Sequence, residues 1–386
     1  MEGDIVCTGN VYDIRNESSM FIKDGLTKSY SEEILTYTVF AFIVIVGLAA
    51  NGVFIFVVYK VERMRTVMNA YLVNLAIADM IILGYGYLDR FYYYVSTPLN
   101  AGTEFLGPIY CIVAVFLEFT YYVSLFTVLM FSMERYTAVC RPMQHMKISN
   151  TSRTRLILLG TWIFAFVFAT LQIPGKGRRV ALCILFPEDG EYSHLSGDVH
   201  YCEPFVPFWF NAIGVPLQLL PFYAAIMGTA FFYIAIIATL TKREDSMSGR
   251  KESQSQAVKA KRSRHSATRM IVINGCVFFL CNAPIQFYVT VTWIFDIVGY
   301  EVQLPITARR NIFLVLTILL YLNSAINPFI YGLTNRQYRT ALFEAIFPFS
   351  RRETLVSGHQ MLTLRSSGID SASKQRETPS QKLSKT

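Results

Sequence analysis

Charged side chains are scarce in this sequence. Only 16% of its 386 residues are Asp, Glu, Lys or Arg, whereas 53% are hydrophobic, and the mean hydropathy is +0.37. An ordinary soluble domain carries charge on about 25% of its residues. The composition therefore excludes that class and favours a protein embedded in a membrane.

Sequence motifs of enzyme chemistry are also missing. The chain has no HExxH zinc motif, no Walker phosphate-binding loop and no pattern of a Ser-His-Asp triad. All five histidines fall outside the apolar runs: His145, His194, His200, His265 and His359. We therefore expect no enzyme activity. The repeated halves of transporters and the residue rings of channels are not evident either, so those two classes stay as minor alternatives.

Long apolar runs dominate the chain instead. Each is long enough to cross a bilayer as a helix, the structure that satisfies backbone polar groups in lipid. The seven runs cover residues 34–59, 69–95, 108–140, 154–173, 208–240, 267–298 and 310–333. We therefore expect an all-α membrane protein with a seven-helix bundle at 34–333. Residues 1–33 lack the basic start and apolar core of a cleavable signal peptide, so the first run must act as its own insertion signal.

Basic residues in short loops predict the orientation. They follow the first, third and fifth runs: Lys60, Arg63, Arg65, Arg141, Lys147, Arg153, Lys242, Arg243, Arg250, Lys251, Lys259, Lys261, Arg262 and Arg264. The positive-inside rule makes these loops cytoplasmic and the amino terminus extracellular. The net charge of +8 then reflects topology and requires no nucleic-acid partner. Asn16, in the sequon Asn16-Glu17-Ser18, is the expected glycosylation site.

The seven cysteines divide between the two sides of the membrane. Cys7, Cys111, Cys183 and Cys202 fall outside, where lasting disulfides form, and the other three fall in helices. Four cysteines allow three connectivities. We expect Cys111 to pair with Cys202, and a Cys7–Cys183 pair is the weaker expectation.

The chain changes character after the seventh run. Residues 335–343 place apolar side chains at helical spacing beside basic ones, so we expect a short amphipathic helix on the cytoplasmic membrane surface, at 334–347. Residues 348–386 are polar and rich in Ser and Thr, and we expect a disordered cytoplasmic tail there.

Two short motifs lie at the inner ends of predicted helices. Glu134-Arg135-Tyr136 ends the third run, and Asn327-Pro328-Phe329-Ile330-Tyr331 ends the seventh. In this order, with Asn51, Asp79, Trp162, Pro221 and Pro284 on the remaining helices, the chain resembles the class A, rhodopsin-like G-protein-coupled receptors. The resemblance covers residues 34–347 and is nearest in kind to the ghrelin and neuromedin group of peptide receptors.

The resemblance implies a signalling role. It implies a heterotrimeric G protein as partner, with arrestin and a receptor kinase acting on the tail. It also implies a set of coupling and activation residues: Glu134, Arg135, Tyr136, Pro221, Phe278, Pro284, Asn327, Pro328 and Tyr331. Some members of the family have an acidic residue on the sixth helix that pairs with the arginine at this position. This chain has Arg264 there instead. We therefore expect Glu134 to be the resting partner of Arg135.

Asp79 is a carboxylate predicted to lie in the middle of the membrane, where an unpaired charge is costly. Ser124, Asn323, Ser324 and Asn327 match the sodium pocket of the family, so the resemblance implies an allosteric sodium ion held by oxygen ligands. The alternative is a dry hydrogen-bonded knot that joins the helices. No other cofactor is expected.

The chain departs from the family pattern at two places that concern activation. Two residues before Pro284, where the family usually has tryptophan, stands Asn282. Eight residues after Pro221, where a tyrosine is usual, stands Thr229, while Tyr233 lies four residues further on. Stabilisation of the active state by that tyrosine is therefore in question.

Polar and aromatic residues gather on the outer halves of the predicted helices. The candidate ligand-binding residues are Asp89, Glu118, Tyr121, Tyr122, Gln172, Gln286, Tyr288 and Tyr321. The two acids favour a cation-seeking cavity, although Asp89 has the alternative of pairing with Arg90. A long second external loop and an acidic amino-terminal segment favour a peptide ligand that carries Arg or Lys. An amine receptor is the alternative.

Overall fold

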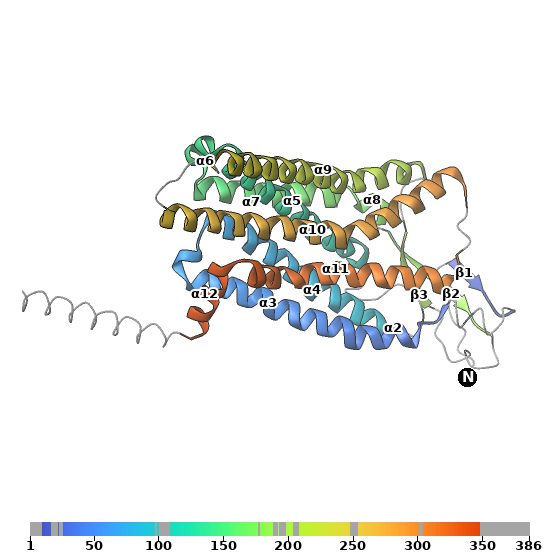
Figure 1. Ribbon diagram of the computed structural model, residues 1–386. Coiled ribbons are helices and arrows are strands. Elements are labelled where there is room, and N and C mark those ends of the chain that lie inside the picture. The colour runs from blue at the N-terminus through green and yellow to red at the C-terminus, as the bar shows by residue number, and fades with distance from the viewer. Residues whose placement is uncertain are drawn as a thin grey trace, which may run out of the picture.

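The computed structural model describes residues 10–16, 22, 26–96, 99, 109–176, 178–187, 192, 198–203, 208–247, 254–300 and 304–347. Seven helices in these ranges are long and apolar enough to cross a membrane. They are α3 (Ala41–Lys60, continued outward by α2, Tyr30–Leu35, and the π-helical η2, Thr36–Phe40), α4 (Val67–Ser96), α5 (Tyr110–Cys140), α7 (Thr151–Thr170), α9 (Phe208–Met247), α10 (Gln254–Val298) and α11 (Ile306–Thr334). They run lengthwise beside one another (Figure 1). The predicted helical bundle is confirmed.

The helix α5 occupies the centre of the bundle. It packs against α4, α7, α9 and α10, whereas α3 packs against α4 and α11. Three helices contain proline: Pro216 and Pro221 in α9, Pro284 in α10 and Pro328 in α11. Because a proline inside a helix removes one backbone hydrogen bond, each is a place where the helix bends easily.

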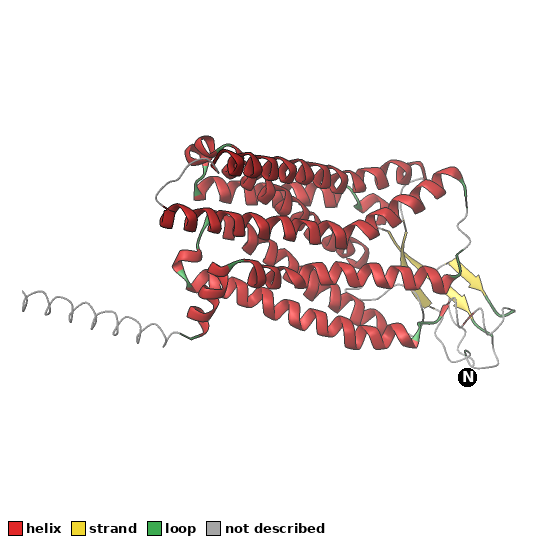
Figure 2. Cartoon of the chain, in the orientation of Figure 1, coloured by secondary structure: helices red, strands yellow, loops and turns green. Residues whose placement is uncertain are grey.

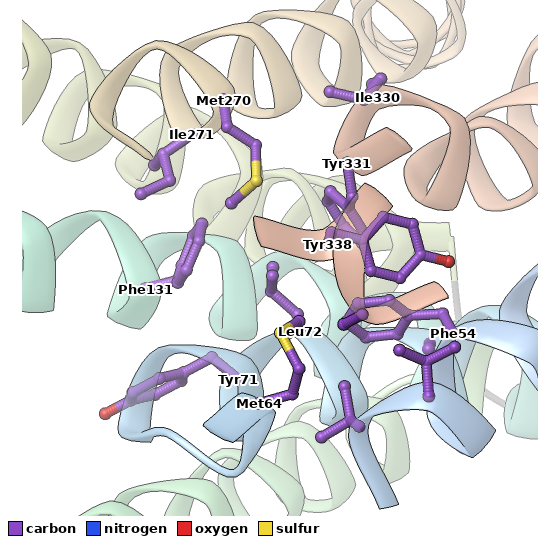
Figure 3. Close-up of a cluster of buried hydrophobic side chains, with 14 of the residues drawn as sticks. Phe54, Met64, Tyr71, Leu72, Phe131, Met270, Ile271, Ile330, Tyr331 and Tyr338 are labelled. Atoms are coloured by element: carbon purple, nitrogen blue, oxygen red, sulfur yellow. The ribbon is translucent and has the colours of Figure 1, made fainter. Parts of the chain in front are cut away.

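Short helices close one end of the bundle. The helices α6 (Pro142–Ile148) and α12 (Arg336–Ile346) lie at the end opposite the labelled amino terminus (Figure 1). Between the long helices, a cluster of buried side chains fills this end, with Met270 and Ile271 of α10 near Phe131 of α5 (Figure 3). Ion pairing holds α12 to the turn η3 (Glu62–Met64), since Arg63 contacts Glu344 at 2.6 Å.

A small β-sheet covers the other end, and the sequence did not predict it. It consists of β1 (Asn10–Asp13), β2 (Arg178–Leu185) and β3 (Asp198–Glu203), with β1 parallel and β3 antiparallel to β2. The strands lie at the end of the amino terminus (Figure 2). The strand β1 is far in the sequence from β2, with which it pairs, and neither of these two segments has the alternating pattern of a half-buried strand.

A disulfide fixes this sheet to the bundle. The predicted Cys111–Cys202 disulfide is present, and it joins the start of α5 to β3 with a Cα–Cα distance of 5.5 Å. Cys183 of β2 is also disulfide-bonded. Cys7, its expected partner, lies outside the described residues. Asn16, the predicted glycosylation site, is exposed at this same end.

Two glycines of α3 provide a matched test of this packing. A Cβ atom at Gly47 would lie 2.6 Å from Cδ1 of Leu83 in α4 and 2.8 Å from Cβ of Ala325 in α11, whereas at Gly52 nothing lies within 4 Å. We expect Gly47→Ala to lower the free energy of unfolding by about 1–3 kcal/mol, the usual cost of overpacking. Gly52→Ala is the control and should leave the thermal midpoint of the purified protein unchanged or slightly raised, because alanine is the better helix former. Equal midpoints for the two variants would contradict this close approach of α3, α4 and α11.

Candidate functional site

A carboxylate lies in the centre of the bundle. Asp79 of α4 is fully buried, and its Oδ2 atom accepts a hydrogen bond of 2.7 Å from Nδ2 of Asn327 in α11. Its Oδ1 atom is buried without a hydrogen-bond partner. Because a buried carboxylate oxygen without a partner is costly, this atom needs a compensating group.

Other buried oxygen atoms near Asp79 also lack a hydrogen-bond partner. The residues predicted to form the cage with Asp79, namely Ser124, Asn323 and Ser324, are all buried. Three buried side-chain oxygens on α5 and α11 have no hydrogen-bond partner: Ser124 Oγ, Asn323 Oδ1 and Asn327 Oδ1. The helix α4, which carries Asp79, packs against both α5 and α11. One carboxylate and several neutral oxygens form a donor set that fits a small hard cation such as sodium.

Two buried asparagines connect this centre to its surroundings. Asn51 of α3 donates to the backbone oxygens of Gly47 and of Ser324 in α11, at 2.9 and 3.0 Å. Asn74 of α4 donates to Thr127 of α5 and accepts from Trp162 of α7, both at 2.8 Å. The polar centre therefore ties together five of the seven spanning helices.

Polar side chains also connect α5, α9 and α10 in their halves nearer the β-sheet, which are called the outer halves. Gln218 of α9 donates to Oε1 of Glu118 at 3.3 Å, and Gln286 of α10 donates to the hydroxyl of Tyr121 at 3.1 Å. Three of these four residues were predicted to bind ligand. Their side chains lie between helices, so a ligand that competes for their hydrogen bonds would change how α9 and α10 pack on α5.

Three further candidate ligand residues are almost fully buried. Tyr122 is 1% exposed, stacks on Phe126 at 6.1 Å and donates to the backbone oxygen of Gln218. Tyr321 packs edge-on against Phe40 at 5.1 Å. Gln172 is 7% exposed, and its Nε2 atom has no hydrogen-bond partner. The first two side chains contribute to packing between helices.

A cavity of about 340 Å³ opens at the outer end of the bundle. It is lined by Glu32, Arg90, Tyr93, Tyr94, Tyr288, Arg309, Arg310, Phe313 and Leu314. Tyr288 is the candidate ligand residue that lines it. Asp89 makes no ion pair with Arg90 within 4 Å, although the charge of Arg90 acts on it, and its Oδ1 atom is buried without a hydrogen-bond partner.

Sequence reasoning missed the ion pair of this cavity. Glu32 of α2 and Arg310 of α11 form two hydrogen bonds of 3.2 Å, and Tyr94 donates to the same carboxylate at 3.1 Å. A signal was present, because an acid precedes the first apolar run and an arginine starts the seventh. Nothing in the sequence says that the two runs meet there.

Lys28 lies beside the same cavity. Its amino group is 4.0 Å above the ring of Tyr93 and donates to the backbone oxygen of that residue. Burial lowers the pKa of Lys28 to about 8, and the nearby Glu33 opposes this shift. The pKa stays above 7, so the lysine remains mainly charged at neutral pH.

At the inner end, the structure corrects the expected partner of Arg135. The buried carboxylate of Glu134 binds Arg153 of α7 at 3.1 Å, His145 of α6 at 3.0 Å and Ser149 at 3.4 Å. Arg135 has no ion pair within the ranges that the structure describes, and its Nε atom lacks a hydrogen-bond partner. The expectation was wrong because Arg153, nineteen residues away, offers its guanidinium from the start of the next helix.

A tyrosine joins α5, α9 and α10 at this end. The hydroxyl of Tyr233 accepts a hydrogen bond from Ser132 of α5 and donates one to the backbone oxygen of Ile271 in α10, each of 3.0 Å. A Cβ atom at Gly275 would come within 2.2 Å of this hydroxyl. Glycine therefore lets the tyrosine reach across to α10.

The remaining predicted activation residues lie around these groups. Tyr136 packs on Phe232 of α9 at 5.3 Å. Phe278 is 1% exposed, in the core between α9 and α10. Tyr331, three residues after Pro328, packs on Phe54 at 5.0 Å, and its buried hydroxyl has no hydrogen-bond partner. These aromatic contacts hold the inner halves of the helices together.

Comparison with known proteins identifies the family. Residues 50–331 match the model of the 7 transmembrane receptor (rhodopsin family). This chain belongs to that family. It is 27% identical over 352 residues to neuromedin-U receptor 2 of Mus musculus, covering 86% of this chain and 84% of that protein. It is 25% identical over 317 residues to the allatostatin-A receptor of Bombyx mori (80% and 78%), and 24% identical over 377 residues to the tachykinin-like peptides receptor 99D of Drosophila melanogaster (92% and 67%).

The receptor departs from its family on α10. Asn282, at the usual tryptophan position, is 1% exposed and donates to the backbone oxygen of Phe278 at 2.7 Å, one turn earlier on the same helix. The side chain therefore folds back on α10 instead of reaching another helix. Nearby, Phe222 of α9 packs on Phe279 at 5.8 Å, so an aromatic contact still joins α9 to α10.

The contacts of Glu134 predict which variants raise basal activity. We expect Glu134→Gln and Arg153→Gln each to increase ligand-free nucleotide exchange on a purified G protein several-fold, because each weakens the tie between α5 and α7. Loss of about 1–2 kcal/mol from a charge-assisted hydrogen bond corresponds to such a change. Arg155→Gln, an exposed change on α7, is the control. Basal exchange that is equal in Arg153→Gln and the unmodified receptor would show that this ion pair does not restrain it.

Proposed function

We propose that the receptor binds an extracellular peptide and, in response, stimulates guanine-nucleotide exchange on a heterotrimeric G protein. The observation that carries the choice of ligand is the set of relatives, which are receptors for neuromedin-U, allatostatin-A and tachykinin-like peptides. Each matches at least 80% of this chain, so the similarity extends over the outer halves of the helices, where a ligand binds.

The outer end of the bundle supports a peptide over a small amine. Polar residues that a peptide backbone or side chain can contact are spread over several helices, with Glu118 on α5, Gln286 on α10 and the cavity between α2, α4 and α11. A small amine fills one site between a few helices.

The distribution of charge and disulfides supports an extracellular amino terminus. The Cys111–Cys202 disulfide lies at the end where the amino terminus lies, and disulfides persist outside the cell. Lys60, Arg63 and Lys147 lie at the opposite end, as the positive-inside rule requires of the cytoplasmic side. We accordingly place the receptor in the plasma membrane with α6 and α12 in the cytoplasm.

The inner end supports the choice of a G protein as partner. Arg135 is without an ion pair among the described residues, in the part of α5 that faces the cytoplasm. Such an arginine is available to donate hydrogen bonds to backbone oxygens of a partner that enters between α5 and α10. Arrestin and a receptor kinase are further proposed partners, acting on residues 348–386, which lie outside the described residues.

Sodium is proposed as an allosteric ligand of the central site. Asp79 would hold the ion through Oδ1, with Ser124 Oγ and Asn323 Oδ1 as neutral ligands, because these buried oxygens have no hydrogen-bond partner. The ion supplies positive charge to the buried carboxylate. Its proposed effect is to favour the packing in which α4, α5 and α11 remain close together.

A screen tests the main proposal. The purified receptor in lipid nanodiscs, combined with purified G proteins of several classes, is exposed to a library of neuropeptides and a library of biogenic amines. We expect at least one peptide to raise nucleotide exchange tenfold or more and no amine to do so, and Arg135→Ala to abolish the response without changing peptide binding. Activation by an amine alone, or peptide-driven transport of a solute without exchange, would overturn the proposal.

A salt substitution tests the sodium site without any agonist. The thermal midpoint of the nanodisc receptor is measured in sodium chloride and in potassium chloride at the same concentration. We expect a higher midpoint in sodium, because an ion that binds only the folded state stabilises it. The difference should vanish in Asp79→Asn and persist in Asp89→Asn, the control carboxylate at the outer end of α4. Identical midpoints in both salts would favour the dry hydrogen-bonded knot.

A further inference from the structure

The outer cavity has a charge opposite to the one expected for the ligand site. Its lining contains three arginines, Arg90, Arg309 and Arg310, and one acid, Glu32. The candidate acids Asp89 and Glu118 do not line it. Among the described residues, the lining of this cavity is therefore richer in basic than in acidic side chains, and it lies beside the acidic residues from which sequence reasoning expected a cation-binding pocket.

The acid of the cavity is already satisfied. Both carboxylate oxygens of Glu32 accept hydrogen bonds from Arg310, and Oε2 also accepts from the hydroxyl of Tyr94. Arg310 makes a further bond of 3.3 Å to the backbone oxygen of Thr27. The charges of Glu32 and Arg310 therefore largely cancel. The Glu32 carboxylate, held in this pair, does not attract a further cation strongly.

Arg90 is the arginine of this lining for which the described residues show no carboxylate ion pair, although the charge of Asp89 acts on it from nearby. Its Nε atom donates to Oγ1 of Thr36 at 3.2 Å, and its guanidinium lies 4.3 Å from the ring centroid of Phe40. No carboxylate pairs with it within the described residues, including its neighbour Asp89. One edge of a planar guanidinium is thus held in place, and its terminal nitrogens remain suited to a two-point contact with an oxyanion.

The other walls suit the same kind of group. Tyr93, Tyr94 and Tyr288 give the cavity aromatic sides, and Lys28 adds a further positive charge above the ring of Tyr93. Arg309 is exposed at the rim. A positive site with partly apolar walls attracts an anion from solution and strengthens its hydrogen bonds once water is displaced.

We propose that this cavity is a subsite for an anionic group of the peptide ligand, either a carboxylate or a sulfate ester, bound by Arg90. The inference rests on the proposed peptide function. It predicts that the ligand carries charges of both signs, with a basic group directed to Asp89 and Glu118 and an acidic group directed to the space between α2, α4 and α11.

A small anion tests the subsite without the natural ligand. The probe is tyrosine O-sulfate amide, and the uncharged comparison is tyrosine amide. Binding to the full-length receptor in nanodiscs is measured by saturation-transfer NMR, with empty nanodiscs subtracted. We expect saturable binding of the sulfate but not of the amide, and at least a tenfold weakening in Arg90→Gln, as for loss of a charge-assisted bidentate contact. Equal binding of the two probes, or binding that is unchanged in Arg90→Gln, would overturn the proposal.

Matched variants separate a binding effect from misfolding. Arg90→Lys retains the charge without the planar fork and should weaken sulfate binding less than Arg90→Gln. Arg309→Gln removes an exposed charge of the lining and should weaken sulfate binding two- to fivefold, less than Arg90→Gln. Arg155→Gln, at the cytoplasmic end, is the control and should bind normally. Sulfate binding that tracks the thermal midpoint of the variants, instead of their charge, would contradict the subsite.

A second experiment distinguishes failure of the anion subsite from failure of the proposed peptide function. Each peptide that activates the receptor in the screen is remade with its Asp, Glu or sulfotyrosine residues replaced by uncharged counterparts. We expect one replacement to reduce potency at least tenfold in the unmodified receptor and to have no effect in Arg90→Gln. If peptides activate with no such dependence, the subsite is wrong and the peptide function stands. If tyrosine O-sulfate amide binds through Arg90 but no peptide activates, the peptide function is wrong and the anion site stands.

Discussion

The hydrogen bond between Asn327 and Asp79 is the interaction on which the bundle depends. It places a carboxylate in the middle of the membrane, where the cost of burial is acceptable only with several polar partners. Asn51 and Asn74 extend this centre to α3, α5 and α7, so five spanning helices meet at polar contacts instead of apolar ones alone. Directional bonds of this kind fix which helix faces meet, and they also allow a second arrangement when one partner changes.

The two ends of the molecule are connected through α10 and α11, both of which contain a proline. On the outside, Gln286 of α10 and Arg310 of α11 bind side chains of α5 and α2. On the inside, Tyr233 holds α10 to α5 through Ile271, and Glu134 holds α5 to α7 through Arg153. A ligand that competes for the outer contacts therefore acts on helices whose inner ends are held by only a few bonds, which is the arrangement that a two-state switch requires.

Much of this architecture is legible in the sequence, and the rest depends on contacts between distant segments. The helices follow from apolar length alone and α12 from its helical spacing, whereas the location of the cysteines left three connectivities open, of which the expected Cys111–Cys202 pair is present. The sheet, the pairing of Glu32 with Arg310 and that of Glu134 with Arg153 did not follow, because each requires knowing which loops meet. Tyr233 shows the same limit: counting from Pro221 suggested a missing tyrosine, whereas the structure brings one to the α5–α10 interface.

The central claim is that the inner ends of α5 and α10 separate when the receptor engages its G protein. Spin labels on Arg155→Cys of α7, which the Arg153–Glu134 ion pair ties to α5, and on Arg269→Cys of α10 would report this by pulsed electron-spin distance measurement. Cys140, Cys276 and Cys281 are replaced by serine. On adding nucleotide-free G protein to the nanodisc receptor, the account predicts a new population at longer distance that disappears when guanine nucleotide is restored. A distance distribution that stays unchanged while the complex forms would contradict it.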